Sequence, residues 1–436
     1  MPDHIGTMTA QTARGEELTT AGRAIGIGPQ WLARLWSGGI ARILDRIDAG
    51  LERGTIAATF PDGTSRILGG RLAGMSCEVH VRNWRALLRL ATGGSVGWYQ
   101  AWANGEWDSP DMVPLFALFM DNAQALGGTA RAHGPWRLLA RMLHRLHRNT
   151  REGALTNIHA HYDLGNDFYA AWLGETMLYS SALYERLPEG PDAMGQFFSP
   201  LDRAQAAKID AIVERLDLDE GARVLEIGCG WGTTAAFLAS NRNVHVDAIS
   251  LSDEQLAFAR DHWNLEQGSV DFRKQDYRDV DGAYDAIVSI EMVEAVGREF
   301  WPDYMDCIAR NLKPGGRAAI QYIALRDDLF EAYARSADFI QAYVFPGGLL
   351  IKESEFRALA EERGLQWQDR QGFGLDYART LREWREAFDA AVRDGRLPAG
   401  FDQRFVRFWR YYLSYCEGGF LGRGIDVAQV TLVRPG

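Results

Sequence analysis

The stretch RVLEIGCGWG, residues 223–232, decides the fold of this chain. Arg223–Ile227 is a short apolar run that predicts a buried strand, and it leads directly into Gly228, Gly230 and Gly232. Glycines let the backbone turn sharply after a strand and approach a ligand closely, and ligands bind at this end of a parallel sheet. We therefore expect a strand, a ligand-binding turn and a helix here.

Strands and helices alternate downstream of this turn, which predicts βαβ units and hence an α/β fold, a Rossmann-like parallel sheet with helices on both faces. The expected strands are residues 223–227, 244–249, 286–290 and 318–322, and the expected helices are residues 235–240, 254–263 and 304–312. Earlier, residues 54–68 alternate around a Pro-Asp-Gly-Thr turn and predict a hairpin. We expect a small N-terminal α+β domain at 1–150 and the α/β domain at 151–436.

Composition limits the classes of function. The 436 residues carry a net charge of −11, which argues against general nucleic-acid binding. The four cysteines form no CxxC pair, so they predict no zinc site and suit a reducing compartment. No apolar run approaches the roughly 20 residues that cross a bilayer, and the N-terminus lacks the apolar segment of a signal peptide. A cytoplasmic protein is expected.

Residues 131–151 form the most basic stretch of the chain. Trp136 and three leucines recur there at helical spacing, and arginines recur about every four residues on another face. This pattern predicts a basic amphipathic helix. It suits an anionic membrane surface, but a helix between domains with one solvated face would show the same pattern.

The glycine turn also indicates the ligand. Its spacing is not GxGxxG, and the segment that starts at Glu226 resembles instead the acidic-x-Gly-x-Gly motif of class I S-adenosylmethionine-dependent methyltransferases. Further along, Asp276 precedes the strand at 286–290. Its carboxylate suits an adenine amine beside Tyr277, although an acid at such a turn is also a common cap.

Several ordered motifs now resemble one family. They are HYDLGNDFY (161–169), MLYSSA (177–182), GCGWG, SLSDEQ, QDYRD, EMVEAVG, YVFPGG and FVRFWRYYLSYCEGGF (405–420). Together they resemble the cyclopropane fatty acid synthase family from about residue 150 to the end. The resemblance implies S-adenosylmethionine-dependent alkylation of a cis double bond in a phospholipid acyl chain. It also implies peripheral attachment to the inner face of a membrane and, as one possible assembly, a homodimer.

The resemblance assigns cofactor contacts to eleven residues. They are Glu226, Gly228, Gly230 and Gly232 in the glycine loop, Tyr179 and Ser180 at the amino-acid end, Ser250 and Gln255 at the ribose, and Asp276, Tyr277 and Arg278 at the adenine. Neutral serine and glutamine side chains can bond ribose hydroxyls without an acidic residue.

The resemblance also implies a catalytic anion. Because an alkene is a poor nucleophile, its methylation leaves a carbocation, which an apolar, aromatic and anionic site would stabilise. The family uses a bound bicarbonate to remove a proton and close the ring. The matching ligands here are Ser181, Glu294, Gln321, Ile323 and Tyr412. Ser181 stands where Cys is usual and Gln321 where His is usual, although a backbone amide and a glutamine can still donate to an anion.

These departures keep other outcomes open. The same cation could lose its proton elsewhere and give a methyl-branched or methylated chain rather than a cyclopropane. A small-molecule methyltransferase is a second hypothesis. A lipid-binding protein with a decayed catalytic site is a third, motivated by Ser181 and Gln321.

Overall fold

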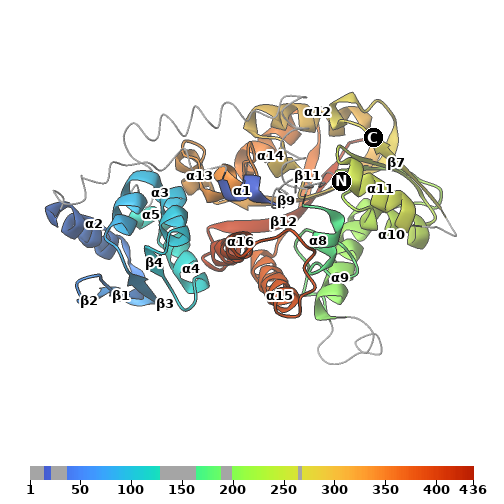
Figure 1. Cartoon of the computed structure of the whole chain (residues 1–436). Coiled ribbons are helices and arrows are strands. Elements are labelled where there is room, and N and C mark those ends of the chain that lie inside the picture. The colour runs from blue at the N-terminus through green and yellow to red at the C-terminus, as the bar shows by residue number, and fades with distance from the viewer. Residues whose placement is uncertain (1–13, 21–36, 128–163, 188–198, 264–267) are drawn as a thin grey trace, which may run out of the picture.

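The structure is a computed structural model that describes residues 14–20, 37–127, 164–187, 199–263 and 268–436. It contains two sheets, one built by the N-terminal residues and one by the rest of the chain (Figure 1). The predicted basic helix at 131–151 and the predicted domain boundary at residue 150 lie outside the described residues.

The larger sheet has the strand order β11-β12-β9-β8-β5-β6-β7, with β10 paired to β9. The strands are β5 (Arg223–Ile227), β6 (His245–Ser250), β7 (Ser269–Lys274), β8 (Tyr284–Ile290), β9 (Leu312–Leu325), β10 (Ile351–Lys352), β11 (Gln366–Gly372) and β12 (Ile425–Val433). Strands β5 to β9 are parallel, as predicted. The sheet as a whole is mixed, because β12 runs antiparallel to both β9 and β11.

Helices cover both faces of this sheet. They include α9 (Pro200–Leu216), α10 (Thr233–Arg242), α11 (Asp253–His262), α12 (Trp301–Asn311), α13 (Asp327–Tyr333) and α14 (Glu353–Glu362). Alternate residues of a strand point to opposite faces. On β8, Ile287 therefore packs with the side chains of α12 and α14, and Ala286 and Val288 pack with those of α9 and α10. The predicted α/β fold with helices on both faces of the sheet is confirmed.

The N-terminal sheet has the order β2-β1-β3-β4. Its strands are β1 (Arg53–Thr59), β2 (Ser65–Gly69), β3 (Leu72–Val81) and β4 (Trp107–Asp108), and the helices before and around it are α1 (Glu16–Thr20), α2 (Ser37–Gly50), α3 (Arg85–Ala103), α4 (Val113–Asp121) and α5 (Ala123–Leu126). Strands β1 and β2 are antiparallel neighbours, which confirms the predicted hairpin.

Helix α4 joins the N-terminal part to the C-terminal end of the chain. The last helices are α15 (Gly374–Arg393) and α16 (Gln403–Leu421), and a short helix, α8 (Asn166–Ala170), precedes the large sheet. On α16, a Cβ added to Gly418 would lie 2.4 Å from Phe116 Cβ, and one added to Gly422 would lie 2.5 Å from the Ala117 carbonyl oxygen. The α4 and α16 backbones therefore touch through glycine.

Candidate active site

A cavity of about 190 Å³ lies at the carboxyl ends of β5, β6 and β8. Ten of the eleven residues predicted for the cofactor line it, namely Tyr179, Ser180, Glu226, Gly228, Gly230, Ser250, Gln255, Asp276, Tyr277 and Arg278. Gly232 does not line it. Its φ is +84°, and an added Cβ would lie 2.7 Å from the Phe272 ring, so this glycine allows a tight turn and close packing at the start of α10.

The floor of this cavity suits the amino-acid end of S-adenosylmethionine. Gly230 has a φ of +52°, and no atom lies within 4 Å of an added Cβ, so its backbone is open to a ligand. Glu226 is 3% exposed, and its Oε2 has no hydrogen-bond partner in the described part of the chain. Burial raises the pKa of Glu226 to about 8, against the charge of Lys208. A cationic donor such as an α-ammonium group would satisfy this oxygen.

Lys208 is a buried cation that the sequence analysis did not single out. It is fully buried on α9, and its Nζ donates to Ser180 Oγ at 2.7 Å. Burial lowers its pKa to about 8, while Glu291 and Glu226 oppose that shift. Lys208 lies between Ala204 and Ala211 on one face of the helix. This spacing on an apolar face was the signal in the sequence that the lysine is buried.

Asp276 accepts hydrogen bonds from Arg278 within its own turn. The distances are 3.0 Å from the backbone N–H, 2.9 Å from Nε and 2.6 Å from Nη2. The carboxylate therefore caps the turn, as the alternative interpretation had it. Both residues line the cavity, so contact with adenine stays a prediction.

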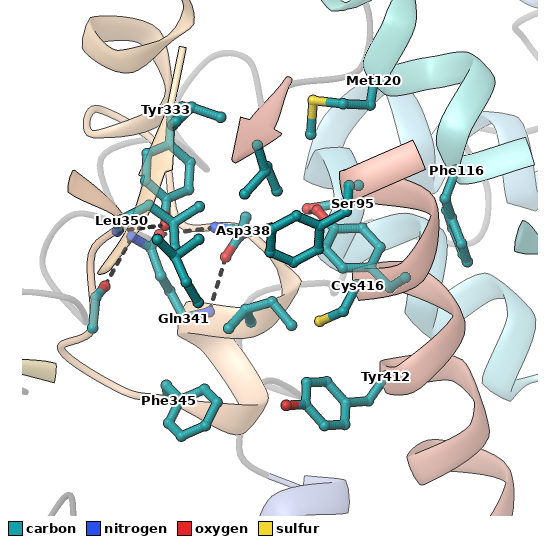
Figure 2. Close-up of a pocket in the computed structure, with 18 of the residues that line it drawn as sticks. Ser95, Phe116, Met120, Tyr333, Asp338, Gln341, Phe345, Leu350, Tyr412 and Cys416 are labelled. Atoms are coloured by element: carbon teal, nitrogen blue, oxygen red, sulfur yellow. Dashed lines mark hydrogen bonds between the residues drawn. The ribbon is translucent and has the colours of Figure 1, made fainter. Parts of the chain in front are cut away.

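A second cavity, of about 390 Å³, lies between the N-terminal helices and the catalytic sheet (Figure 2). Its walls are mostly apolar and include Leu90, Trp98, Phe116, Met120, Leu126, Ile323, Leu325, Leu329, Phe345, Leu349, Tyr411, Tyr412 and Phe420. In Figure 2, Phe345 and Tyr412 lie at the opposite end of this cavity from Met120. The two cavities share Tyr179, Glu291 and Ala295, so they meet beside these residues.

Glu291 stands where the cavities meet. It directly follows β8 with a φ of +49°, and its Oε1 accepts the Ser181 backbone N–H at 2.9 Å and Gln321 Nε2 at 2.7 Å. Its Oε2 accepts the Tyr377 hydroxyl at 2.7 Å. Burial raises the pKa of Glu291, but these three donors and Lys208 oppose the shift. Neither Glu291 nor Tyr377 was predicted from the sequence as a site residue.

Glu294 lies one turn further along and has a different environment. The Ile323 backbone N–H donates to its Oε1, and its Oε2 has no partner among the described residues. Burial and the charge of Glu291 raise the pKa of Glu294 to about 8. The proton of this pair therefore favours Glu294, whose carboxyl group has one donor, over Glu291, whose carboxylate has three.

The five residues predicted to bind bicarbonate are thus brought together, but their donors are already engaged. Ser181 and Gln321 donate to Glu291, and Ile323 donates to Glu294. The Tyr412 hydroxyl lies 2.7 Å from that of Tyr179. In this arrangement the residues do not fit a bicarbonate ion, because a protein carboxylate takes the donors that would bind it.

Comparison with known proteins agrees with this geometry. Residues 149–430 match the family model described as mycolic acid cyclopropane synthetase. The chain is 36% identical to the tuberculostearic acid methyltransferase UfaA1 of Mycobacterium tuberculosis, over 80% of this chain and 81% of the relative. It is 32% identical to the cyclopropane-fatty-acyl-phospholipid synthase of Escherichia coli, over 82% of this chain and 88% of the relative.

Solved structures show the same relationship. The cyclopropane synthase MmaA2 from Mycobacterium tuberculosis superposes with a TM-score of 0.57 and 27% identity, covering 64% of this chain and 98% of its own. The mycolic acid cyclopropane synthase CmaA1, complexed with SAH and CTAB, gives a TM-score of 0.57 and 28% identity over the same shares. This chain therefore belongs to the cyclopropane fatty acid synthase family, whose S-adenosylmethionine-dependent enzymes transfer methyl or methylene groups to lipid acyl chains.

Proposed function

We propose that this enzyme transfers a one-carbon group from S-adenosylmethionine to the cis double bond of an unsaturated phospholipid acyl chain. The observation that carries the proposal is the meeting of two cavities of different chemistry. One is lined by the polar loop residues of the methyltransferase sheet, the other is largely apolar, and Glu291 lies at their junction. An electrophilic methyl group and a buried alkene would meet there.

The smaller cavity would hold S-adenosylmethionine, which supplies an electrophilic methyl group on a sulfonium. The open backbone at Gly230 would lie against its amino-acid end, where the unpaired Glu226 oxygen would accept from the ammonium group. Ser250 and Gln255 line the same cavity and carry groups that can bond ribose hydroxyls.

The larger cavity would hold the acyl chain and exclude water from it. Apolar walls favour an apolar chain, because burial of apolar surface contributes about 25 cal/mol per Å². Tyr179, Tyr412 and Glu291 line this cavity, and the proposed cation would form beside them. Aromatic faces and a preorganised anion both stabilise such a cation.

A site on the N-terminal sheet supports a membrane-bound substrate. Ile67 is 71% exposed, Leu72 58% and Met75 36%, and they lie on β2 and β3 near Arg66 and Arg71 in sequence. Exposed apolar side chains suit the boundary between headgroups and acyl chains, and the neighbouring Arg66 and Arg71 are paired with Asp45 and Asp48. None of the helices in the described ranges is both long and apolar enough to cross a bilayer. From the exposed apolar side chains of β2 and β3, we propose peripheral binding at the inner membrane face.

The test supplies methyl-deuterated S-adenosylmethionine to the purified enzyme with vesicles of dioleoyl phosphatidylglycerol, free oleate or an oleoyl thioester. Labelled product from the vesicles alone would support the phospholipid proposal, and product from either other lipid alone would refute it. Two retained deuterons with cyclopropyl proton signals would indicate ring closure. Three retained deuterons would indicate methylation with loss of a chain proton.

The other hypotheses make different predictions for the same assay. A small-molecule methyltransferase would turn over without lipid, and it would have no use for an apolar cavity of this size. A decayed site would bind the cofactor but label no lipid. Of the two residues that motivated that hypothesis, Gln321 donates its side-chain amide to Glu291, and Ser181 donates its backbone N–H to the same oxygen.

A further inference from the structure

We propose that Glu291 is the general base of this enzyme, a built-in carboxylate that stands in place of the bicarbonate expected from the family resemblance. The inference rests on the proposed function, because it names the group that removes the proton in that reaction. Its structural basis is the hydrogen bonding of one side chain at the junction of two cavities.

The hydrogen bonds place a carboxylate where an exchangeable anion would sit. Two of the donors expected to bind bicarbonate, the Ser181 N–H and the Gln321 amide, converge on Glu291 Oε1 at 2.9 and 2.7 Å. The Tyr377 hydroxyl fixes Oε2 at 2.7 Å. Three donors hold the carboxylate in one position. A second anion at this position would be repelled by the negative charge of Glu291 and would overlap its side chain.

The neighbouring charges favour the ionised form of Glu291. Lys208 contributes a positive charge from α9, and the three donors favour a carboxylate over an acid. Glu294 has one donor and takes the proton of this acidic pair. The hydrogen bonds therefore favour the carboxylate form at Glu291 and the protonated form at Glu294, which are distinct roles for two glutamates three residues apart.

The proposed step balances without a further reactant. The π pair of the alkene bonds to the incoming methyl carbon, the carbon–sulfur bond breaks with its pair on sulfur, and the acyl chain gains one positive charge. Glu291 then accepts a proton, and the C–H bonding pair neutralises the cation. A proton taken from the transferred methyl closes a ring, and one taken from the chain leaves a methylated alkene. The proton passes from Glu291 to water before the next turnover.

The backbone at this position explains how the base is aimed. Glu291 has a φ of +49°, in the left-handed region that is strained for a non-glycine residue. This bend after β8 turns the side chain towards Ser181 and Gln321. Glycine adopts the same backbone without strain, so Glu291→Gly removes the carboxylate and frees its donors.

The first test removes bicarbonate from the wild-type reaction. Turnover on phospholipid vesicles is measured in buffer purged of carbon dioxide, with and without added bicarbonate. We expect equal rates, because the base belongs to the protein. A wild-type rate that falls when bicarbonate is removed would overturn the proposal.

The second test compares two variants. Glu291→Gln keeps the shape of the side chain but cannot accept a proton, so turnover should fall about 10²- to 10⁴-fold and bicarbonate should not restore it. The turnover of Glu291→Gly should fall by a similar factor and recover when bicarbonate is added. The matched control is Glu362→Gln, whose side chain is 69% exposed and lines neither cavity, and it should behave as wild type. Wild-type turnover by Glu291→Gln would contradict the assignment.

A binding measurement separates this proposal from the proposed function. In the presence of S-adenosylhomocysteine, the Glu291→Gly variant should broaden the NMR signal of ¹³C-labelled bicarbonate, and the wild-type enzyme should not. Bicarbonate binding to wild type would refute the inference whatever the activity. If bicarbonate binds to Glu291→Gly and not to wild type, but no lipid is turned over, the proposed function is refuted. The same result would support the inference that Glu291 occupies the anion site. If Glu291→Gly does not fold, the wild-type and Glu291→Gln experiments still decide.

Discussion

Replacing Tyr377 with Phe should shift the acidic limb of the pH–rate profile to higher pH. The substitution removes only the hydroxyl that donates to Glu291 Oε2 at 2.7 Å and leaves the buried ring in place. A hydrogen bond to a charged group contributes about 1.5–3 kcal/mol, and 1.36 kcal/mol corresponds to one pKa unit. The pKa of Glu291 should therefore rise by about 1–2 units. Because the base must be ionised, activity should be lost at a correspondingly higher pH.

The assay is the pH dependence of kcat/KM with vesicles of a zwitterionic lipid, whose own charge stays constant over the range. The alkaline limb should move much less, because Lys208 and Glu294, with pKa values of about 8, keep their own partners. At high pH, Tyr377→Phe should recover most of the wild-type rate. That recovery distinguishes a raised pKa from general damage to the site.

The matched control is Tyr322→Phe. It also removes a hydroxyl from a buried ring and a hydrogen bond to a carboxylate, since Tyr322 donates to Glu353 Oε2 at 3.0 Å. Glu353 lines neither of the two cavities, so the acidic limb should stay in place. An unchanged acidic limb in Tyr377→Phe, or an equal shift in both variants, would refute the reasoning.

Three other variants test the remaining parts of the site. Glu226→Gln should weaken binding of S-adenosylmethionine about 10-fold or more in calorimetry, because a bound ammonium group would stabilise Glu226 as a carboxylate and glutamine cannot carry that charge. Met120→Trp should narrow the apolar cavity, so kcat/KM should fall more for long acyl chains than for short ones, and an equal fall would contradict the assignment. Burial raises the pKa of Asp338 to about 6 from 3.8, so its contribution to stability is present below about pH 4 and lost as pH rises through about 6. In urea unfolding, Asp338→Asn should therefore be more stable than wild type by about 3 kcal/mol at pH 7.5 and show little of this gain at pH 4.

The sequence predicted the central part of the fold because its signals are local. Strand β5, the glycine turn and helix α10 follow one another within about twenty residues, and a run of buried side chains marks a strand covered on both faces. Strands β7 and β11 gave no such signal. They lie at the edges of the sheet, and most of their side chains are not buried. Their sequences are therefore polar and lack the apolar run that predicts a buried strand.

The sequence predicted those parts of the site in which the residues of a short motif share one role. The cofactor residues lie in short motifs at strand ends, and ten of them line one cavity. Glu291 takes its role from Ser181, Gln321 and Tyr377, which lie 110, 30 and 86 residues away along the chain. The order of residues along the chain does not show that these donors converge on one carboxylate. Lys208 was missed for the same reason, since its partner Ser180 is 28 residues away.

The glycine contact between α4 and α16 limits how this enzyme can be recombined with its relatives. A Cβ at Gly418 or Gly422 would collide with Phe116 or with the backbone of α4, so the two helices fit only as a pair. A chimera that takes its first 130 residues from one parent and its last helix from another would have a mismatched seam, and this seam borders the larger cavity. Functional hybrids should therefore inherit residues 113–121 and 403–421 together, although nearly three hundred residues separate them in the sequence.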